Sequence, residues 1–133
     1  MLLAEKPWEQ GELFPSVTAA DKLFTRKLLE NYMLNKQMVE AFAQQATLPD
    51  QKQKVYQSKK EEVENIELAF NLIQDPEVKR IVEHRFFKLR KWKETVKYYN
   101  GRGLSEKTVD RHIDKGVEAI ADSLKLWGYL QNN

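Results

Sequence analysis

Residues 100–109 read NGRGLSEKTV, and this stretch decides how the C-terminal half of the chain folds. Gly101 and Gly103 provide the backbone freedom of a tight turn between crossing helices, because glycine tolerates positive φ angles. Ser105 is a good helix N-cap, and an apolar stripe at helical spacing follows it. The stripe predicts a last helix that reaches about Gly128. Its inward-facing members are Val109, Ile113, Gly116, Val117, Ile120, Leu124 and Trp127.

A strong helix start lies upstream, at Asp75-Pro76-Glu77. The Asp can accept a backbone N–H, proline suits the first helical position, and an acid in the first turn complements the helix dipole. We expect one helix from here to about Arg90 and a short helix from about Lys91 to Tyr99. Their inward stripes are Val78, Ile81, Val82, Arg85, Phe86 and Leu89 in the first, and Trp92, Val96 and Tyr99 in the second.

Long helices are also expected in the N-terminal half, because no glycine occurs between Ser16 and Asn100. Ser16 is the predicted N-cap of a helix that runs to about Ala46. At about 1.5 Å per residue such a helix would span about 45 Å, which exceeds the diameter of a domain this small. It therefore either breaks near residues 31–35 or projects and finds a partner.

A second helix is expected over about residues 51–74, with an apolar seam at heptad spacing. An intramolecular hairpin and a dimeric coiled coil explain this seam about equally well. The seam consists of Tyr56, Val63, Ile66, Phe70 and Ile73.

Residues 1–15 contain Pro7, Gly11 and Pro15, which disfavour regular structure. We expect an irregular arm here whose aromatic side chains dock on the helices.

Together these elements predict an all-α protein, since no segment alternates with the period of two typical of a half-buried strand. The 133 residues suit one domain with one core. We expect an irregular arm (1–15), then a long N-terminal helical hairpin that supplies dimerisation (16–74), and then a C-terminal three-helix helix-turn-helix unit (75–133).

Composition excludes several classes of protein. Hydrophobic residues make up 41% of the chain and charged residues 32%, which is typical neither of a membrane protein nor of a disordered chain. The absence of cysteine excludes disulfides, thiolate metal sites and a cysteine nucleophile. The first residues lack the apolar run of a signal peptide, so we expect a cytoplasmic protein with no membrane partner.

Charge is divided unequally along the chain. Residues 1–75 contain nine Lys and Arg against twelve Asp and Glu, whereas residues 76–133 contain thirteen against eight, a net charge of +5. A polyanionic partner such as double-stranded DNA explains this basic half, although solvation of helix faces is the simpler alternative. If the last helix enters a major groove, its first turns meet base edges. The predicted base readers are Lys107, Thr108 and Arg111, and the predicted phosphate contacts are Lys88, Arg90, Lys91, Lys93, Arg102, Ser105 and Lys115.

Three segments resemble the region-four helix-turn-helix of sigma factors: VKRIVEHRFF (78–87), WKETV (92–96) and GLSEKTV (103–109). With a helix pair in front, the chain is similar to the phage and prophage late-gene transcription activators of the RinA and ArpU type. This resemblance implies a DNA-binding activator in the cytoplasm of a bacterial host cell and raises RNA polymerase as a second partner.

The sequence departs from that pattern in two places. Residues 100–102 are an insertion of about two residues, and Asp110 and Asp114 occupy positions that are commonly basic or neutral in the family. Acidic side chains near phosphates weaken DNA binding. We therefore expect these two to point away from phosphates, to pair with Arg111 or Lys115, or to accept from cytosine N4.

No enzymatic site is evident in the sequence. The two histidines, His84 and His112, belong to different predicted helices and match no zinc motif. The acids of residues 61–67 follow two lysines and predict a solvated face rather than a carboxylate site. There is also no glycine-rich phosphate loop. We therefore expect no catalytic activity, no cofactor and no metal.

The sequence thus predicts a sequence-specific transcriptional regulator that activates phage or prophage late genes, as a homodimer on double-stranded DNA. Two alternatives remain. One is the small subunit of a phage DNA-packaging terminase, which also couples a helix-turn-helix to an oligomerising helical pair. The other is a helical adaptor, without DNA binding, whose basic half docks an acidic protein. Most of the aromatic side chains among the basic residues are expected to be core rather than a stacking surface for single strands.

Overall fold

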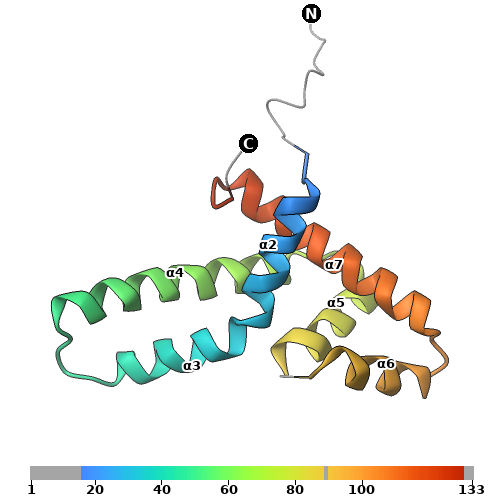
Figure 1. Cartoon of the computed structure of the whole chain (residues 1–133), viewed down its shortest axis with the longest axis horizontal. Coiled ribbons are helices and arrows are strands. Elements are labelled where there is room, and N and C mark those ends of the chain that lie inside the picture. The colour runs from blue at the N-terminus through green and yellow to red at the C-terminus, as the bar shows by residue number, and fades with distance from the viewer. Residues whose placement is uncertain (1–15, 89, 131–133) are drawn as a thin grey trace, which may run out of the picture.

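The computed structural model describes residues 16–88 and 90–130, and every regular element in those ranges is helical, as predicted (Figure 1). The arm predicted over residues 1–15 and the inward position predicted for Leu89 lie outside the described residues. Within these ranges no helix is both long and apolar enough to cross a membrane. The elements are α2 (Ala19–Glu30), α3 (Tyr32–Ala43), α4 (Asp50–Asn71), α5 (Pro76–Val82), the π-helical η1 (Glu83–Phe87), α6 (Trp92–Asn100) and α7 (Glu106–Leu126).

The long helix predicted from Val17 breaks at Asn31, which separates α2 from α3. The backbone N–H of Asn31 and its side-chain amide both donate to the Lys27 carbonyl, each at 3.1 Å. Asn31 has a ψ angle of 0°, so the chain changes direction there. The break is one of the two outcomes expected, and it sends α2 across α7 while α3 runs beside α4 (Figure 1).

The N-cap of α2 is Thr18, and the prediction of Ser16 was wrong. The Thr18 hydroxyl accepts from the Asp21 N–H at 3.1 Å, and the Asp21 carboxylate accepts from the Thr18 N–H at 2.9 Å. This arrangement is a capping box, in which a side chain three residues after the N-cap accepts from the N-cap backbone N–H. Ser16 cannot form one, because the residue three positions later is Ala19. The Ser16 carbonyl instead accepts from the buried Lys125 ammonium at 3.0 Å.

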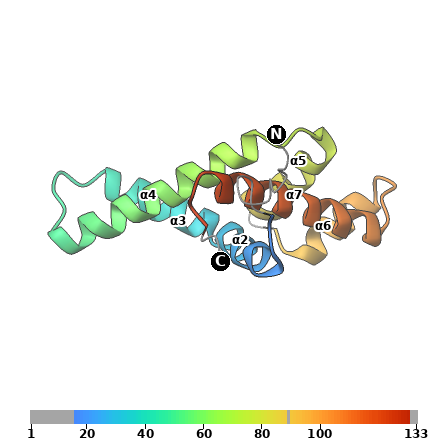
Figure 2. The same ribbon diagram turned by 90° about the horizontal axis from the view of Figure 1, so that it is seen from above.

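The α3–α4 pair extends away from the other helices as two antiparallel rods (Figures 1 and 2). The heptad seam of α4 lies inside the chain, where Val63 and Ile66 are buried. This helix ends at Asn71, three residues before the predicted end. The seam therefore packs within one chain rather than in a dimeric coiled coil.

A cluster of three polar side chains joins α3 to α4, and we call Tyr32, Lys36 and Glu67 the polar latch. The Tyr32 hydroxyl donates to the Glu67 carboxylate at 2.5 Å, and the Lys36 ammonium donates to the same oxygen at 2.7 Å. Burial, together with the hydrogen bond to Glu67, raises the pKa of Tyr32 to about 12. The hydroxyl therefore stays protonated and remains a donor at neutral pH.

The regular helix predicted up to Arg90 changes to the π-helical segment η1 after Val82. The wider turn brings two consecutive aromatic side chains to the interior. Phe86 is buried in the core, and Phe87 stacks on Tyr32 with ring centroids 4.2 Å apart. Phe87 also lies 4.5 Å from the ring of Phe70. Segment η1 thus connects the α3–α4 pair to the C-terminal helices.

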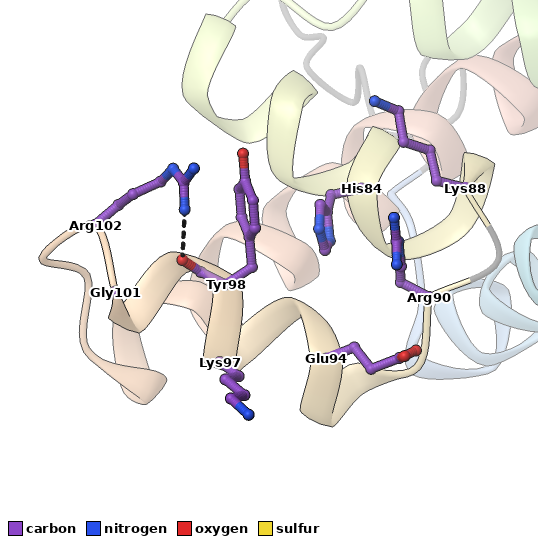
Figure 3. A pocket seen from close by; sticks show the side chains of 8 residues that line it. All are labelled: His84, Lys88, Arg90, Glu94, Lys97, Tyr98, Gly101 and Arg102. Carbon is purple, nitrogen blue, oxygen red and sulfur yellow. Dashed lines mark hydrogen bonds between the residues drawn. The ribbon is translucent and has the colours of Figure 1, made fainter.

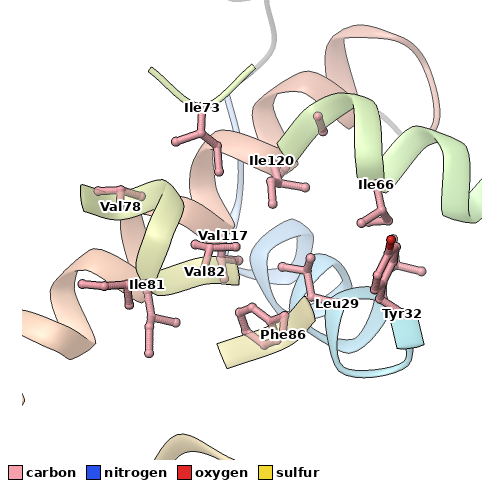
Figure 4. Packing of buried hydrophobic residues seen from close by; sticks show 14 of the residues in the cluster. Leu29, Tyr32, Ile66, Ile73, Val78, Ile81, Val82, Phe86, Val117 and Ile120 are labelled. Carbon is pink, nitrogen blue, oxygen red and sulfur yellow. The ribbon is translucent and has the colours of Figure 1, made fainter. Parts of the chain in front are cut away.

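Helix α7 is the centre of the core, since α2, α4, α5 and α6 all contact it. Figure 4 shows its Val117 and Ile120 among side chains from α2, α4 and α5. Trp127 was wrongly placed in this stripe, because α7 ends at Leu126 and Trp127 is 39% exposed at the C-cap. Leu130 is buried beyond that end instead. The fully buried aliphatic side chains of α7 are Val109, Ile113, Val117, Ile120, Ala121 and Leu124.

Helices α5 and α7 approach closely at Gly116. A Cβ atom at this position would lie 2.2 Å from Cγ2 of Val82 and 3.3 Å from Cγ1 of Val78. Such distances are far inside van der Waals contact, so the position requires glycine. The contact holds α5 against the middle of α7.

Candidate nucleic-acid interface

The turn between α6 and α7 is short and tightly hydrogen-bonded. The N–H groups of Arg102 and Leu104 both donate to the Tyr99 carbonyl at 3.0 Å. Gly103 has a φ angle of +91°, which favours glycine, whereas Gly101 has an ordinary φ of −63°. Only one of the two glycines therefore supplies the positive φ expected here.

Ser105 caps α7 as predicted. Its hydroxyl accepts from the Thr108 N–H at 3.2 Å and donates to the Thr108 hydroxyl at 3.0 Å. The Thr108 carbonyl lies 2.7 Å from Nδ1 of His112, whose Nε2 is 3.2 Å from the Glu77 carboxylate on α5. The predicted reader Thr108 is thus half-buried and bonded within the cap, so its availability to a base is lower than the sequence suggested.

The exposed basic stripe of α7 consists of Lys107, Arg111 and Lys115, which are spaced by four residues and exposed. Residues four apart lie on one face of a helix. Among the described residues, no hydrogen bond or ion pair engages these three side chains. The stripe unites two predicted base readers with a residue predicted to contact phosphate.

Two of the three acids in the first half of α7, Asp110 and Asp114, are bonded to other helices. The Asp110 carboxylate accepts from the Trp92 indole N–H at 2.7 Å. Asp114 accepts from the Lys22 ammonium at 2.9 Å and lies 3.8 Å from the Arg26 guanidinium. Of the three arrangements considered for these acids, pairing with Arg111 or Lys115 does not occur, because α2 and α6 provide the partners.

A groove of about 640 Å³ lies between η1, the following loop and α6 (Figure 3). It unites three of the predicted phosphate contacts, Lys88, Arg90 and Arg102. Lys91 lies with Arg90 beside a second hollow of about 300 Å³ next to α2, and Lys93 belongs to neither. The complete lining of the groove is His84, Lys88, Arg90, Glu94, Lys97, Tyr98, Gly101 and Arg102.

Arg102, Tyr98 and His84 form a stack along one side of this groove. The guanidinium carbon of Arg102 lies 3.7 Å from the centroid of the Tyr98 ring, and the same side chain donates to the Tyr98 carbonyl at 3.2 Å. The His84 ring stacks on Tyr98 with centroids 4.4 Å apart. Figure 3 shows Tyr98 between the other two side chains.

His84 is held in place by a hydrogen bond at one ring nitrogen and by stacking on Tyr98. Its Nδ1 lies 2.9 Å from the hydroxyl of the buried Thr95. Burial lowers the pKa of His84, and the positive charges of Arg90 and Lys88 lower it further. The imidazole is therefore neutral at pH 7, and the charge of the groove comes from Lys and Arg.

Sequence reasoning missed several residues that the structure brings to these surfaces. His84, Lys97 and Tyr98 join the groove, and Lys22 and Arg26 pair with Asp114. The spacing of four between Tyr98 and Arg102 was a usable signal, because such pairs meet on a helix. No local signal links α2 to Asp114, since 92 residues separate Lys22 from it.

In residues 16–88 and 90–130, no group of three or more His, Cys, Asp or Glu side chains is close enough together to hold a metal ion. Comparison with family models, with curated proteins and with solved structures finds no match to this chain. The stripe and the groove are therefore the features of the molecule that bear on its function.

Proposed function

We propose that the protein is a sequence-specific regulator of transcription that binds double-stranded DNA, with α6 and α7 acting as a helix-turn-helix. The observation that carries the proposal is the exposed basic stripe Lys107, Arg111 and Lys115 at the start of α7. Lys and Arg side chains on the first turns of a recognition helix can contact guanine O6 and N7 in the major groove.

The bonding of the neighbouring acids supports this proposal. The ion pairs of Asp114 with Lys22 and Arg26 offset a charge that would repel phosphates. The hydrogen bond from Trp92 to Asp110 also links the start of α6 to α7, which sets the angle between the two helices. A fixed angle matters because a recognition helix must fit the groove while its neighbour lies on the backbone.

Phosphate contacts are proposed for the cations outside the stripe that the sequence also suggested: Lys88, Arg90, Lys91, Lys93 and Arg102. All five are exposed. Phosphate contacts provide orientation and much of the affinity, but they carry no sequence information. The proposal therefore assigns sequence preference to Lys107 and Arg111, and general affinity to Lys115 and these five.

The α3–α4 pair is proposed to dimerise through its outer surface, since its seam is already filled. Leu34, Val55 and Leu68 are 61%, 38% and 52% exposed on the two helices, and Leu72, at the C-cap of α4, is 49% exposed. Two linked copies would bind two half-sites and raise affinity through effective concentration. Activation of phage or prophage late genes, and contact with RNA polymerase, remain part of the proposal through the resemblance described above.

The proposal is tested by selecting genomic DNA fragments on the purified protein and measuring duplex affinity at several salt concentrations. We expect log Kd to change with log salt by about 0.9 per phosphate neutralised. Lys107→Ala with Arg111→Ala should reduce discrimination between the selected site and random DNA by about tenfold or more, because each good base contact provides about 1–3 kcal/mol.

The matched control is Lys52→Ala with Lys54→Ala, which removes the same charge from exposed positions on α4. This control should retain the sequence preference. Failure to retain any duplex at low salt would contradict the proposal, and a stable complex with an acidic protein in its place would favour the adaptor alternative.

A further inference from the structure

The groove between η1 and α6 concentrates positive charge beyond what its single acid can offset. Lys88 and Arg90 come from the loop after η1, whereas Lys97 and Arg102 come from α6 and the turn that follows it. Glu94 is the only acid of the lining, and its carboxylate already accepts from the Lys91 N–H at 2.7 Å at the start of α6. The groove is therefore suited to a ligand with several negative charges.

The aromatic ring in the groove is not available to a flat ligand. Arg102 covers one side of Tyr98 and His84 the other (Figure 3), at 3.7 and 4.4 Å from its centroid. A nucleobase could stack on Tyr98 only by displacing one of them. The charged groups around the stack thus favour recognition of phosphate groups rather than of bases.

We propose that this groove binds a chain of two or more linked phosphate groups, between Lys88 and Arg90 on one wall and Arg102 on the other. Guanidinium groups bind phosphate oxygens in a bidentate fashion, and lysine adds a point charge. The volume of about 640 Å³ lies in the range of small-ligand sites. The same chemistry is offered by a nucleic-acid backbone and by a free polyphosphate.

His84 would report occupancy from within the groove. Arg90, Lys88 and Arg102 lower its pKa, and Glu94 acts in the opposite direction. A phosphate chain between those cations would offset their repulsion of the imidazolium. Occupancy should therefore raise the pKa of His84, which an anion bound elsewhere on the surface would not do.

The test is a titration of the full chain with inorganic pyrophosphate, followed by calorimetry and by the NMR signals of the His84 ring. We expect saturable binding and an increase in the His84 pKa. Lys88→Gln with Arg90→Gln should weaken the affinity by about tenfold or more, since two charged hydrogen-bond donors are lost. Lys52→Gln with Lys54→Gln, the same charge change on α4, should leave the affinity unchanged.

Two results would overturn the inference: binding that does not saturate, or equal loss of affinity in the groove and control variants. Adding duplex DNA distinguishes a nucleic-acid backbone from a free polyphosphate as the source of the bound phosphate groups. Competition between pyrophosphate and duplex identifies the nucleic-acid backbone as the natural ligand, whereas independent binding identifies a free polyphosphate.

This inference goes beyond the proposed function, because pyrophosphate binding requires no duplex. Saturable pyrophosphate binding by a chain that retains no DNA would support the groove and remove the regulatory proposal. Sequence-specific DNA binding without any pyrophosphate site would do the reverse. Lys107→Ala with Arg111→Ala provides the internal check, since it should alter DNA discrimination and leave pyrophosphate affinity intact.

Discussion

The α3–α4 pair and the helices around α7 are held together by different interactions. Six aliphatic side chains of α7 are fully buried, whereas α3 contributes no fully buried side chain. At the α3–α4 interface the polar latch joins Tyr32 and Lys36 to Glu67, and Asn35 donates to Glu62 at 2.7 Å. The stability of the region around α7 should therefore depend on side-chain volume, and the stability of the α3–α4 pair should depend on the protonation of its polar side chains.

This difference also separates a rigid part of the molecule, around α7, from a part that extends into solvent, the α3–α4 pair. Close packing around α7 fixes the angle between α6 and α7, on which a DNA-reading surface depends. The pair extends away from the core with its outer leucines exposed, so it has surface to offer to a second molecule.

Gly116→Ala should produce the largest loss of stability. The new methyl group would lie 2.2 Å from a carbon of Val82, so α5 and α7 must separate. Overpacking of this kind costs about 1–3 kcal/mol, which urea denaturation measures directly. The matched control is Gly101→Ala, whose methyl group would meet nothing closer than 3.5 Å. If the Gly116→Ala protein were as stable as this control, α5 and α7 could separate at less cost in stability than their close packing indicates.

Two buried threonines should respond in opposite directions to replacement by valine. Thr95 is bonded to His84 at 2.9 Å, whereas the Thr25 hydroxyl is buried without a partner in the described part of the chain. Thr95→Val should destabilise by about 1–2 kcal/mol because it leaves the imidazole nitrogen unpaired. Thr25→Val should be neutral or stabilising, because it removes a hydroxyl that has lost its hydrogen bonds with water. Thermal unfolding of both variants provides the measurement, and equal losses would contradict the assignment.

Acid should loosen the α3–α4 pair through Glu67. Burial disfavours its charged form, but the hydrogen bonds from Lys36 and Tyr32 outweigh burial and hold the pKa of Glu67 below its usual 4.5. Its contribution to stability is therefore complete above pH 4.5 and is lost as the pH falls through the lowered native value. Hydrogen exchange at α3 and α4 amides should show decreasing protection in that window.

Glu67→Gln should reduce this acid response, because the amide does not titrate and still offers an oxygen to Tyr32. The amides at the start of α2 provide an internal control. The hydrogen bond from Lys125 is the main cause of the lowered pKa of Asp21, so α2 should respond to acid equally in both proteins. An unchanged response of α3 and α4 in Glu67→Gln would mean that another group governs the pair.

Local signals in the sequence predicted much of the C-terminal half correctly. Asp75 caps α5 and accepts from the Glu77 and Val78 N–H groups at 2.9 and 3.3 Å, as the Asp-Pro-Glu start indicated. Ser105 and Gly103 also have the predicted roles in the turn before α7. These features depend on neighbours within four residues, so the sequence contains all the information they need.

The candidate site was predictable only in part. The exposure of Lys107 and Arg111 followed from the helical period of α7. The stack of Arg102, Tyr98 and His84 did not, because it depends on where η1 ends relative to α6. The partners of Asp114 were not predicted, since the only partners considered within the chain were Arg111 and Lys115 on the same helix, whereas Lys22 and Arg26 of α2 provide them.

The sequence by itself determined the all-helical class, the caps of α5 and α7, and the apolar stripe that makes α7 the centre of the core. Hydrophobic period and capping chemistry act over a few residues and are present in any fold of this chain. The tertiary structure decided the break at Asn31, the π-helical turn that sends Phe87 to Tyr32, and the groove between η1 and α6. Each of these depends on contacts between segments that are far apart in the sequence, and those contacts form only when the whole core packs.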